Sequence, residues 1–365
     1  MAERFDIVVV GAGMAGASLA AELGGASGSG ARLLLLEAEQ QPGYHATGRS
    51  AAFWTESYGG PGVQPLTTAS GPFLRDNGFL SPRGALTLAC EGQEARVEDF
   101  ARSFAARGVR VELFAQAEIA GLLPGLRAGW TLGAFEPDCC DIDVAGLHGF
   151  YLAQAKQAGA QLWCAARLEH SSPEPGGWRL ALADGREVRC AVLVNAAGAW
   201  ADEVALIAGV SPLGIAPLRR TMVQLRIAPE APASLPLVLD IAESFYFKPE
   251  AGRLWLSPHD ESPSPPCDAA PEEIDIATAI ARLESVVDWQ VERVEHKWAG
   301  LRSFAPDRLP VFGFDSSLPE FFWFAGQGGF GIQTAPAAAR LAVRLLMGEV
   351  GGEVDPVPYS PVRFV

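Results

Sequence analysis

Two short apolar runs near the start of the chain enclose a stretch that is rich in glycine and alanine. The run Ile7–Val10 leads into the segment G-A-G-M-A-G at residues 11–16, and a second run, Leu33–Leu36, ends on Glu37. Apolar runs of this length predict buried strands, and the small residues between them favour a helix. The order strand, glycine turn, helix, strand and acidic residue is that of a dinucleotide-binding βαβ unit.

Each glycine of this turn has an expected task. Gly11 permits the tight turn, Gly13 lets the backbone approach a pyrophosphate, and Gly16 lets the helix pack closely against the strand. The helix N-terminus then offers free N–H groups to the phosphates. Glu37 lies about twenty residues beyond Gly16, where a carboxylate accepts hydrogen bonds from ribose hydroxyls. The sequence therefore predicts a bound dinucleotide.

Downstream, the pattern alternates between strands and helices, which predicts an α/β protein with two discontinuous domains. After the βαβ unit, a loop is expected up to about residue 70. One domain is predicted to be Rossmann-like, and the other to be an α+β substrate domain built on an antiparallel sheet. The first comprises residues 1–78, 140–212 and 299–365, and the second residues 79–139 and 213–298. We expect strands over 85–88, 190–195, 217–229 and 237–258, helices over 94–107, 144–158, 272–287 and 336–347, and a proline-rich loop over 262–271.

Composition and charge narrow the range of partners. A net charge of −15 at pH 7 disfavours nucleic acid, and no apolar run approaches the ~18 residues of a membrane-spanning helix. The six cysteines show no metal-type or C-x-x-C spacing, so we expect no metal site and a reduced, cytoplasmic setting. Cys139 and Cys140 are expected to be an incidental pair, because a disulfide between sequence neighbours is strained.

Three further segments carry a resemblance to a known family. They are P-G-Y-H-A-T-G-R-S-A-A at residues 42–52, V-N-A-A-G-A-W at 194–200 and G-Q-G-G-F-G-I at 326–332. They resemble the glycine oxidase/D-amino acid oxidase (DAO) family of FAD-dependent oxidoreductases, and within it the D-arginine dehydrogenases most closely. The resemblance extends over essentially the whole chain. It implies that the Rossmann-like domain is an FAD-binding domain that holds FAD noncovalently at both ends of the cofactor.

The family's cofactor contacts fall on matching positions of these segments. His45 is expected on the nucleotide side of the flavin, where a structural hydrogen bond is favoured over a role as catalytic base. The resemblance implies contacts to FAD from Thr47, Gly48, Arg49, Ser50, Ala51, Ala197, Gly198, Gly328, Gly331, Gln333 and Thr334.

The resemblance also implies a site for a substrate carboxylate. Arg220 and Arg302 match the positions that hold this carboxylate, and a guanidinium fork suits two oxygens at once. Tyr58 and Tyr246 match positions whose hydroxyls lie over the substrate. The backbone carbonyl of Gly329 is the implied acceptor for the substrate amine.

Two further features of the substrate end follow from the resemblance. Tyr58 lies in a segment flanked by Gly59, Gly60 and Gly62 that resembles the family's mobile lid, which excludes water during reaction. Ile332 is expected to pack near the flavin.

Two positions depart from the pattern of the D-arginine dehydrogenases. Ala85 replaces an acid that pairs with the substrate guanidinium, and Phe53 replaces a histidine of the pocket. A lost charge-assisted hydrogen bond costs about 1.5–3 kcal/mol, so D-arginine and D-lysine are expected to be poor substrates. We expect an apolar side chain, as in D-leucine, D-methionine or D-phenylalanine. An acid such as Glu56 or Glu243 is the alternative partner that would reverse this preference.

The reaction that the resemblance implies is oxidation of a D-amino acid by hydride transfer to flavin N5, followed by hydrolysis of the imine to a 2-oxo acid and ammonia. The electron acceptor is O₂ or a quinone-type compound, and the sequence does not separate these. Two alternatives remain. One is another small carboxylate as substrate, namely an N-methyl amino acid, glycine or a 2-hydroxy acid. The other is a flavoprotein subunit without turnover, against which the cluster of arginines and tyrosines argues.

Overall fold

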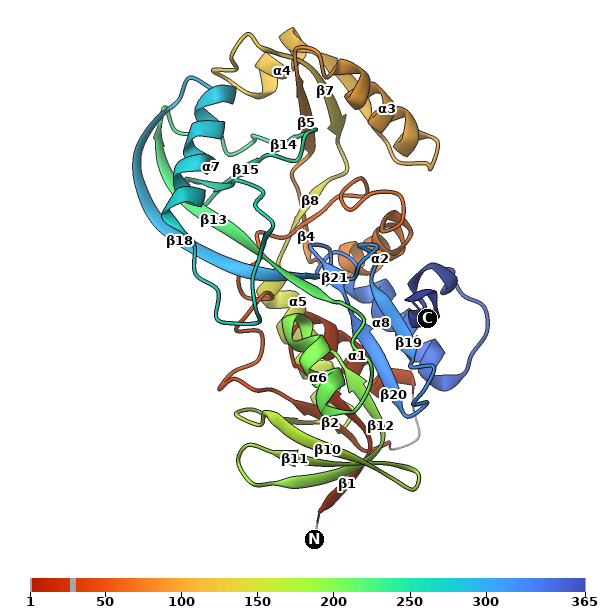
Figure 1. Ribbon diagram of the computed structural model, residues 1–365. Helices are drawn as coiled ribbons and strands as arrows, with labels where there is room; N and C mark the ends of the chain where they lie inside the picture. Colours follow the sequence, from red (N-terminus) through yellow and green to blue (C-terminus); the bar gives the residue numbers. More distant parts are fainter. Residues whose placement is uncertain (1, 27–30, 365) are drawn as a thin grey trace.

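The structure, a computed structural model, describes residues 2–26 and 31–364. Within these residues, the strands form one large sheet at the lower end of the molecule in Figure 1, another at its upper end, and a small sheet between them. The mixed α/β architecture confirms the predicted fold class.

The predicted βαβ unit forms the middle of the lower sheet. β1 (Glu3–Val10) pairs in parallel with β2 (Leu33–Leu36) on one side and with β12 (Glu187–Asn195) on the other. All four leucines of β2 are buried, as expected for a parallel strand that is covered on both faces. The sheet continues through β9 (Gln161–Trp163), β10 (Leu168–Glu174), β11 (Gly177–Leu182), β19 (Val311–Phe314) and β20 (Phe321–Ala325).

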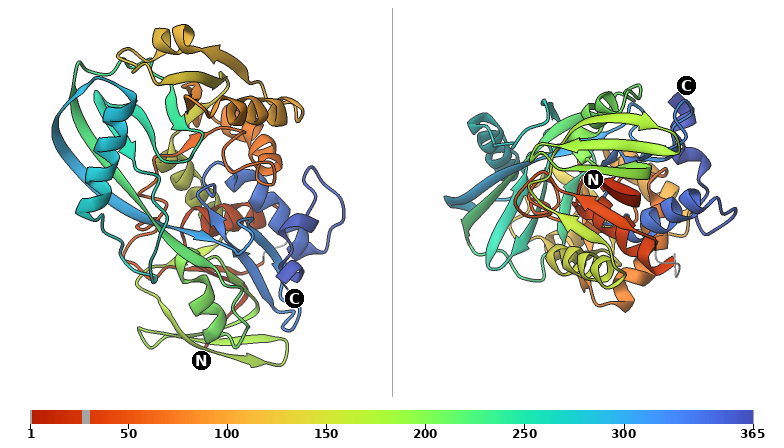
Figure 2. Two further views of the ribbon diagram at one scale, coloured as in Figure 1. Left: turned by 45° about the horizontal axis from the view of Figure 1, so that its top comes forward. Right: turned by 90° about the horizontal axis from the view of Figure 1, so that it is seen from below.

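Helices from distant parts of the chain pack together beside this sheet. α1 (Met14–Ala26) contacts both α5 (Val144–Gln157) and α8 (Ala335–Met347). The small side chains of Ala17 and Ala20 on α1 are fully buried, which lets neighbouring elements approach closely. In Figure 2 the C-terminal part of the chain, in blue, accordingly lies next to the N-terminal part, in red.

Two long strands dominate the upper sheet. β13 (Ala216–Ala228) and β18 (Gln290–Phe304) pair in antiparallel orientation and extend from this sheet toward the lower half of the molecule (Figure 1). Because Arg220 pairs with Gly300, Arg302 lies on the same face as Arg220, at a diagonal position. The sheet also contains β5 (Ala85–Cys90), β6 (Glu112–Ala115), β7 (Trp130–Glu136), β14 (Leu237–Asp240), β15 (Tyr246–Glu250), β16 (Arg253–Ser257), β17 (Ser262–Pro263) and β21 (Gln327–Gly328).

The register of this sheet brings further side chains to one face. Tyr246 pairs with Leu239, and Ala85 pairs with Leu237 of the same strand, so Tyr246 and Ala85 share a face. On its other side, Ala85 pairs with Glu136 at the end of β7. The small sheet consists of β3 (Phe53–Trp54), β4 (Leu80–Pro82) and β8 (Cys140–Ile142).

The predicted helices are all present, with ends that differ by at most two residues. The predicted helices over 94–107, 144–158, 272–287 and 336–347 correspond to α3, α5, α7 and α8. The helices not yet described are α2 (Gln64–Asp76), α3 (Glu94–Ala105), α4 (Gln116–Leu122), α6 (Ala201–Ile207) and α7 (Glu273–Val286), with short 3₁₀ turns at Gly198–Trp200, Val357–Tyr359 and Pro361–Phe364.

Two elements differ from the sequence-based expectation. α2 lies partly where a loop was expected, because its threonines, glycine and prolines have low helix propensity and its packing against α8 stabilises it instead. β18 was not predicted, since its first half carries exposed charged residues such as Glu292 and Arg293. Its backbone is nevertheless paired with β13 throughout.

We propose that the domain boundaries expected from the sequence apply to this fold. The boundary between residues 298 and 299 then lies within β18. Within residues 2–26 and 31–364, no helix combines the length and the apolar character that a membrane crossing requires. The six cysteines are all free.

Candidate active site

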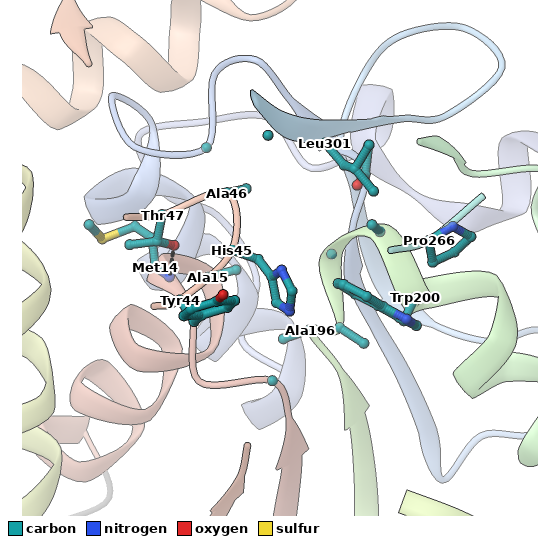
Figure 3. A pocket seen from close by; sticks show the side chains of 18 of the residues that line it. Met14, Ala15, Tyr44, His45, Ala46, Thr47, Ala196, Trp200, Pro266 and Leu301 are labelled. Carbon is teal, nitrogen blue, oxygen red and sulfur yellow. Dashed lines mark hydrogen bonds between the residues drawn. The ribbon is translucent and has the colours of Figure 1, made fainter. Parts of the chain in front are cut away.

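A long cavity lies between the carboxyl ends of the lower sheet and the nearer ends of β13 and β18. It has a volume of about 910 Å³, and the glycine turn lines one part of it while Arg220 and Arg302 line another. In Figure 3, Thr47 lies on one side of this cavity and Trp200 and Leu301 lie on the opposite side. A cavity of this size is typical of cofactor sites.

Steric contacts explain the three glycines of the turn. Gly11 has a φ of +101°, and a Cβ on it would lie 2.5 Å from the backbone oxygen of Ala196. A Cβ on Gly16 would lie 1.9 Å from the backbone oxygen of Gly11, so Gly16 is a packing position. Gly13 lines the cavity, and a Cβ on it would lie 3.2 Å from Oγ1 of Thr47. A side chain at Gly13 would therefore occupy the space beside the turn.

Two side chains bind the backbone of this turn. The buried Glu37 carboxylate accepts hydrogen bonds from the N–H groups of Ala12 (3.2 Å) and Glu39 (3.0 Å). The Thr47 hydroxyl accepts a hydrogen bond from the N–H of Met14 (2.9 Å), at the N-terminus of α1. Both side chains line the cavity, where they are available to a ligand.

His148 is a contributor to the turn that sequence reasoning missed. Its Nε2 is 2.9 Å from the carbonyl oxygen of Ala12, and burial lowers the pKa of its imidazole. A neutral ring that donates from Nε2 to this carbonyl fixes the turn from the side of α5. A histidine within an apolar helix was the available sequence signal.

Arg302 forms the centre of the other end of the cavity. Its Nη1 donates to the Tyr58 hydroxyl (2.7 Å), and its Nη2 lies 3.4 Å from the Tyr246 hydroxyl, which accepts from it. Gly329 is close to the same guanidinium, because a Cβ on this glycine would lie 2.6 Å from Nη1. The structure thus brings together Arg302, Tyr58, Tyr246 and Gly329, four residues that the resemblance assigns to the substrate.

Arg220 lies on the same face of the sheet and is only 3% exposed. Its Nε donates to the carbonyl oxygen of Asp260 (2.8 Å), and its Nη2 donates to the Glu261 carboxylate (3.2 Å). Its Nη1 is buried and has no hydrogen-bond partner among the described residues. A buried donor without a partner is costly, so this guanidinium has capacity for a further acceptor.

His259 is a second residue that sequence reasoning missed. Its Nε2 is 3.4 Å from the Tyr58 hydroxyl, and its ring meets the Tyr246 ring edge-on at 5.7 Å. Burial and the nearby guanidinium groups of Arg220 and Arg302 lower the pKa of His259 to about 2, so its ring is neutral. It follows β16 with a φ of +53°, a loop position that no sequence pattern marks.

A small chamber adjoins the arginine end. Its volume is about 20 Å³, and its walls include Phe53, Tyr58, Tyr246 and Ile332. The Phe53 ring meets the Tyr58 and Tyr246 rings edge-on at 5.0 and 6.0 Å. Ala85 does not line this chamber but is buried behind it, in one cluster with Phe53 and Tyr246.

Comparison with known proteins identifies the family. Residues 6–345 match the profile of the DAO family, described as FAD dependent oxidoreductase. The chain belongs to this family. The mouse FAD-dependent oxidoreductase domain-containing protein 1 is 24% identical over 419 residues, which cover 99% of this chain and 85% of the mouse protein.

Two solved structures have the same fold. L-proline dehydrogenase from P. horikoshii has a TM-score of 0.86 at 21% identity, covering 100% of this chain and 98% of that one. Glycine oxidase from Geobacillus kaustophilus has a TM-score of 0.85 at 22% identity, covering 100% of both chains.

FAD is the cofactor of the DAO family, and the cavity of this chain fits it. Gly13 leaves room for a pyrophosphate at the N-terminus of α1, and Glu37 on the cavity wall would bind the ribose. His45 is on the wall of this part of the cavity, with its ring 4.6 Å from that of Trp200 and a hydrogen bond to Glu39 (2.9 Å). The other predicted contact residues that line the cavity are Ser50, Ala51, Ala197, Gly198, Gly328 and Gly331.

Arg49 and Gly48 form hydrogen bonds within the protein itself. The Arg49 guanidinium donates to the carbonyl oxygens of Ala269 and Ala299 (3.0 Å each) and pairs with Asp268. It thus attaches the 268–269 loop to β18, although part of Arg49 lines the cavity. The N–H of Gly48 donates to the carbonyl oxygen of Gly43, and Gly48 does not line the cavity.

Gln333 and Thr334 are buried and do not line the main cavity. Thr334 donates its hydroxyl to the carbonyl oxygen of Phe330 (2.8 Å). Gln333 lines the small chamber, and its side-chain amide binds the backbone of Thr55 and Tyr58. In the structure, Gln333 therefore supports the substrate end.

Proposed function

We propose that this chain is an FAD-dependent oxidoreductase that acts on a D-amino acid with an uncharged side chain. One observation carries the proposal, namely that the buried Arg220 and the half-buried Arg302 lie on one sheet face at one end of the FAD cavity. The free Nη1 of Arg220 and the tyrosine-lined guanidinium of Arg302 are suited to a carboxylate.

Bound FAD would supply the oxidant, because the flavin accepts a hydride from the carbon next to the substrate amine. The protein's part is orientation. The arginines hold the carboxylate, and the carbonyl oxygen of Gly329 accepts a hydrogen bond from the amine. Ile332 lines both the cavity and the small chamber, and we propose that it packs against the flavin.

The walls and the volume of the chamber favour a substrate whose side chain is short and uncharged. Phe53, Tyr58 and Tyr246 supply aromatic rings, and the volume of about 20 Å³ is of the order of one water molecule. Glu56, one of the two acids that the sequence analysis named as possible partners for a basic substrate, accepts a hydrogen bond from the Thr68 hydroxyl and does not line the chamber. The buried acid next to Ala85 is Glu136, whose oxygens already accept hydrogen bonds.

The small chamber also favours a second candidate, in which glycine or an N-methyl amino acid is oxidised at the same site. Both candidates need the same carboxylate site and differ in the substituent on the carbon or the nitrogen. We further propose that the acceptor is O₂ or a quinone-type compound and that FAD is held noncovalently. A cytoplasmic location stays a prediction from the cysteines.

A substrate screen tests this proposal. The FAD-loaded protein is mixed without oxygen with D-alanine, D-leucine, D-arginine, their L-enantiomers, glycine, N-methylglycine and lactate, and bleaching of the flavin absorbance is followed. We expect bleaching by D-alanine or D-leucine. Bleaching by glycine or N-methylglycine alone selects the second candidate, and the absence of bleaching by every carboxylate overturns both. Repeating the reaction with O₂ and with a quinone identifies the acceptor.

A further inference from the structure

A buried carboxylate lies beneath the turn that carries Tyr58. Glu136, the last residue of β7, is 3% exposed. It accepts hydrogen bonds from the hydroxyls of Thr55 (2.7 Å) and Ser57 (2.5 Å) and from the backbone N–H of Glu56 (2.7 Å). All three donors belong to residues 55–57, directly before Tyr58. Glu136 therefore binds this turn and no other element through these bonds.

Gln333, just before α8, holds the same turn. Its Oε1 accepts a hydrogen bond from the N–H of Thr55 (3.3 Å), and its Nε2 donates to the carbonyl oxygen of Tyr58 (3.1 Å). The backbone at both ends of the turn is thus fixed. The left-handed glycines Gly59 and Gly60 follow only after Tyr58. The geometry is that of a fixed wall over residues 55–58, with any lid movement confined to the residues that follow.

The ionised form of the Glu136 carboxyl destabilises the folded state. Burial raises the pKa of its carboxyl despite the three hydrogen bonds, and the Glu56 carboxylate raises it further. Among the described residues, the fully buried thiol of Cys139 also interacts with this carboxylate, which helps to raise the pKa of the thiol. An acid whose pKa is raised in the folded state destabilises that state once it is ionised. Such a group is more readily explained by a task at the site than by stability.

We propose that Glu136 is a positioning residue that places the Tyr58 hydroxyl on Arg302 and closes the small chamber with the Tyr58 ring. This proposal rests on the proposed carboxylate-binding role of Arg302. Tyr58 accepts the hydrogen bond from Nη1 of Arg302 (2.7 Å), and its ring packs edge-on against Phe53 and Phe330. When the turn loosens, Arg302 loses a partner and the chamber loses a wall.

The test compares Glu136→Gln and Ser57→Ala with a matched control, Glu56→Gln. The Gln variant keeps the volume but has one acceptor oxygen fewer, and Ser57→Ala removes one donor without altering β7. The control makes the same chemical change on the turn itself, where the Glu56 side chain binds Thr68 and its backbone N–H donates to Glu136. KM and kcat are measured with the best substrate of the screen, together with the dissociation constant of propionate from the shift in flavin absorbance.

We expect KM and the propionate dissociation constant to rise by about tenfold or more in Glu136→Gln and by a smaller factor in Ser57→Ala. The maximal rate of flavin reduction should fall less than KM rises, and FAD content should be unchanged. The melting temperature of Glu136→Gln at neutral pH should equal or exceed that of the wild type, because a buried charge is removed. The control should match the wild type in KM, in propionate binding and in FAD content, although its melting temperature can rise because the Glu56 charge next to Glu136 is removed.

Three outcomes would overturn the proposal. If the wild type binds propionate and both variants bind it as tightly, Glu136 does not position the site, while the proposed function stands. If Glu136→Gln lowers the melting temperature without changing KM, its role is structural. If the wild type binds no carboxylate, the proposed function fails and this proposal fails with it. Should Glu136→Gln not fold, Ser57→Ala and Thr55→Val decide between the same outcomes.

Discussion

The two ends of the cavity are built in different ways. The nucleotide end is made largely by residues 10–51 and 196–200, whose backbone and small residues form much of the surface, and Glu37 and Thr47 complete it. The substrate end is made by side chains from separate strands and loops, which meet only because β13 and β18 pair in one register. The nucleotide end therefore depends on small residues that leave room for the ligand. The substrate end depends on further residues that hold its arginines and tyrosines in place.

The nucleotide end should therefore fail completely when one small residue is enlarged. Gly13→Val places atoms in the cavity beside Thr47, at a position where φ is not left-handed, so the fold should survive while FAD does not bind. FAD content is read from the ratio of visible to ultraviolet absorbance after purification. Gly149→Val, at a glycine with open space around it, is the control and should retain FAD. A yellow Gly13→Val protein would contradict this view of the turn.

The substrate end should lose turnover and keep its cofactor when its central side chain is removed. Arg302→Ala is expected to lower kcat/KM by two or more orders of magnitude, about 3 kcal/mol, as for a lost bidentate charge pair. FAD content should not change. The control is Arg226→Ala, a half-exposed arginine that pairs with Glu295 near the other end of β13. Normal turnover of carboxylate substrates by Arg302→Ala would make this arginine structural.

The same contrast explains what the sequence could and could not predict. The βαβ unit, the glycine roles and Glu37 follow from local patterns, and the fold class and FAD follow from them together with the resemblance. Arg302 and Tyr246 also came from the resemblance, because their neighbouring residues form motifs. His259 and Glu136 could not be found in this way, since their partners lie far away in the sequence. Such contacts depend on strand register and loop conformation, which one sequence does not reveal.

Side-chain selectivity sharpens the comparison at the chamber. We expect the wild type to favour D-alanine and D-leucine over D-arginine by at least about tenfold in kcat/KM, because a guanidinium would be buried in an aromatic chamber without a free acid. Phe53→Ala enlarges the chamber and should raise the ratio of activity on D-leucine to that on D-alanine. Phe100→Ala, in a separate cluster, is the control for the loss of a phenylalanine. A wild-type preference for D-arginine would mean that Glu136 or another acid is accessible to the substrate.

The smallest expected effect concerns His259, which contacts the same Tyr58 hydroxyl as Arg302. His259→Phe removes the acceptor for the Tyr58 hydroxyl and keeps an aromatic ring, so KM should rise by about three- to tenfold, the worth of one hydrogen bond. His259→Gln restores an acceptor and should recover part of this loss. Because the ring is neutral in the folded protein, the wild-type KM should not follow a histidine titration between pH 5 and 8.

Stability gives the matching test of the neutral ring at His259. Its pKa is about 2 in the folded chain, below the ordinary value of 6.5, so the unfolded chain binds the extra proton first as the pH falls. The contribution of the neutral ring to stability is therefore complete above pH 6.5 and is lost below it, by up to about 2 kcal/mol at pH 5. Melting temperatures of the wild type and His259→Gln, measured from pH 7.5 to 5, should converge as the pH falls. A constant difference between them would mean that His259 titrates in the folded chain as it does in the unfolded one, and the depressed pKa would then have to be abandoned.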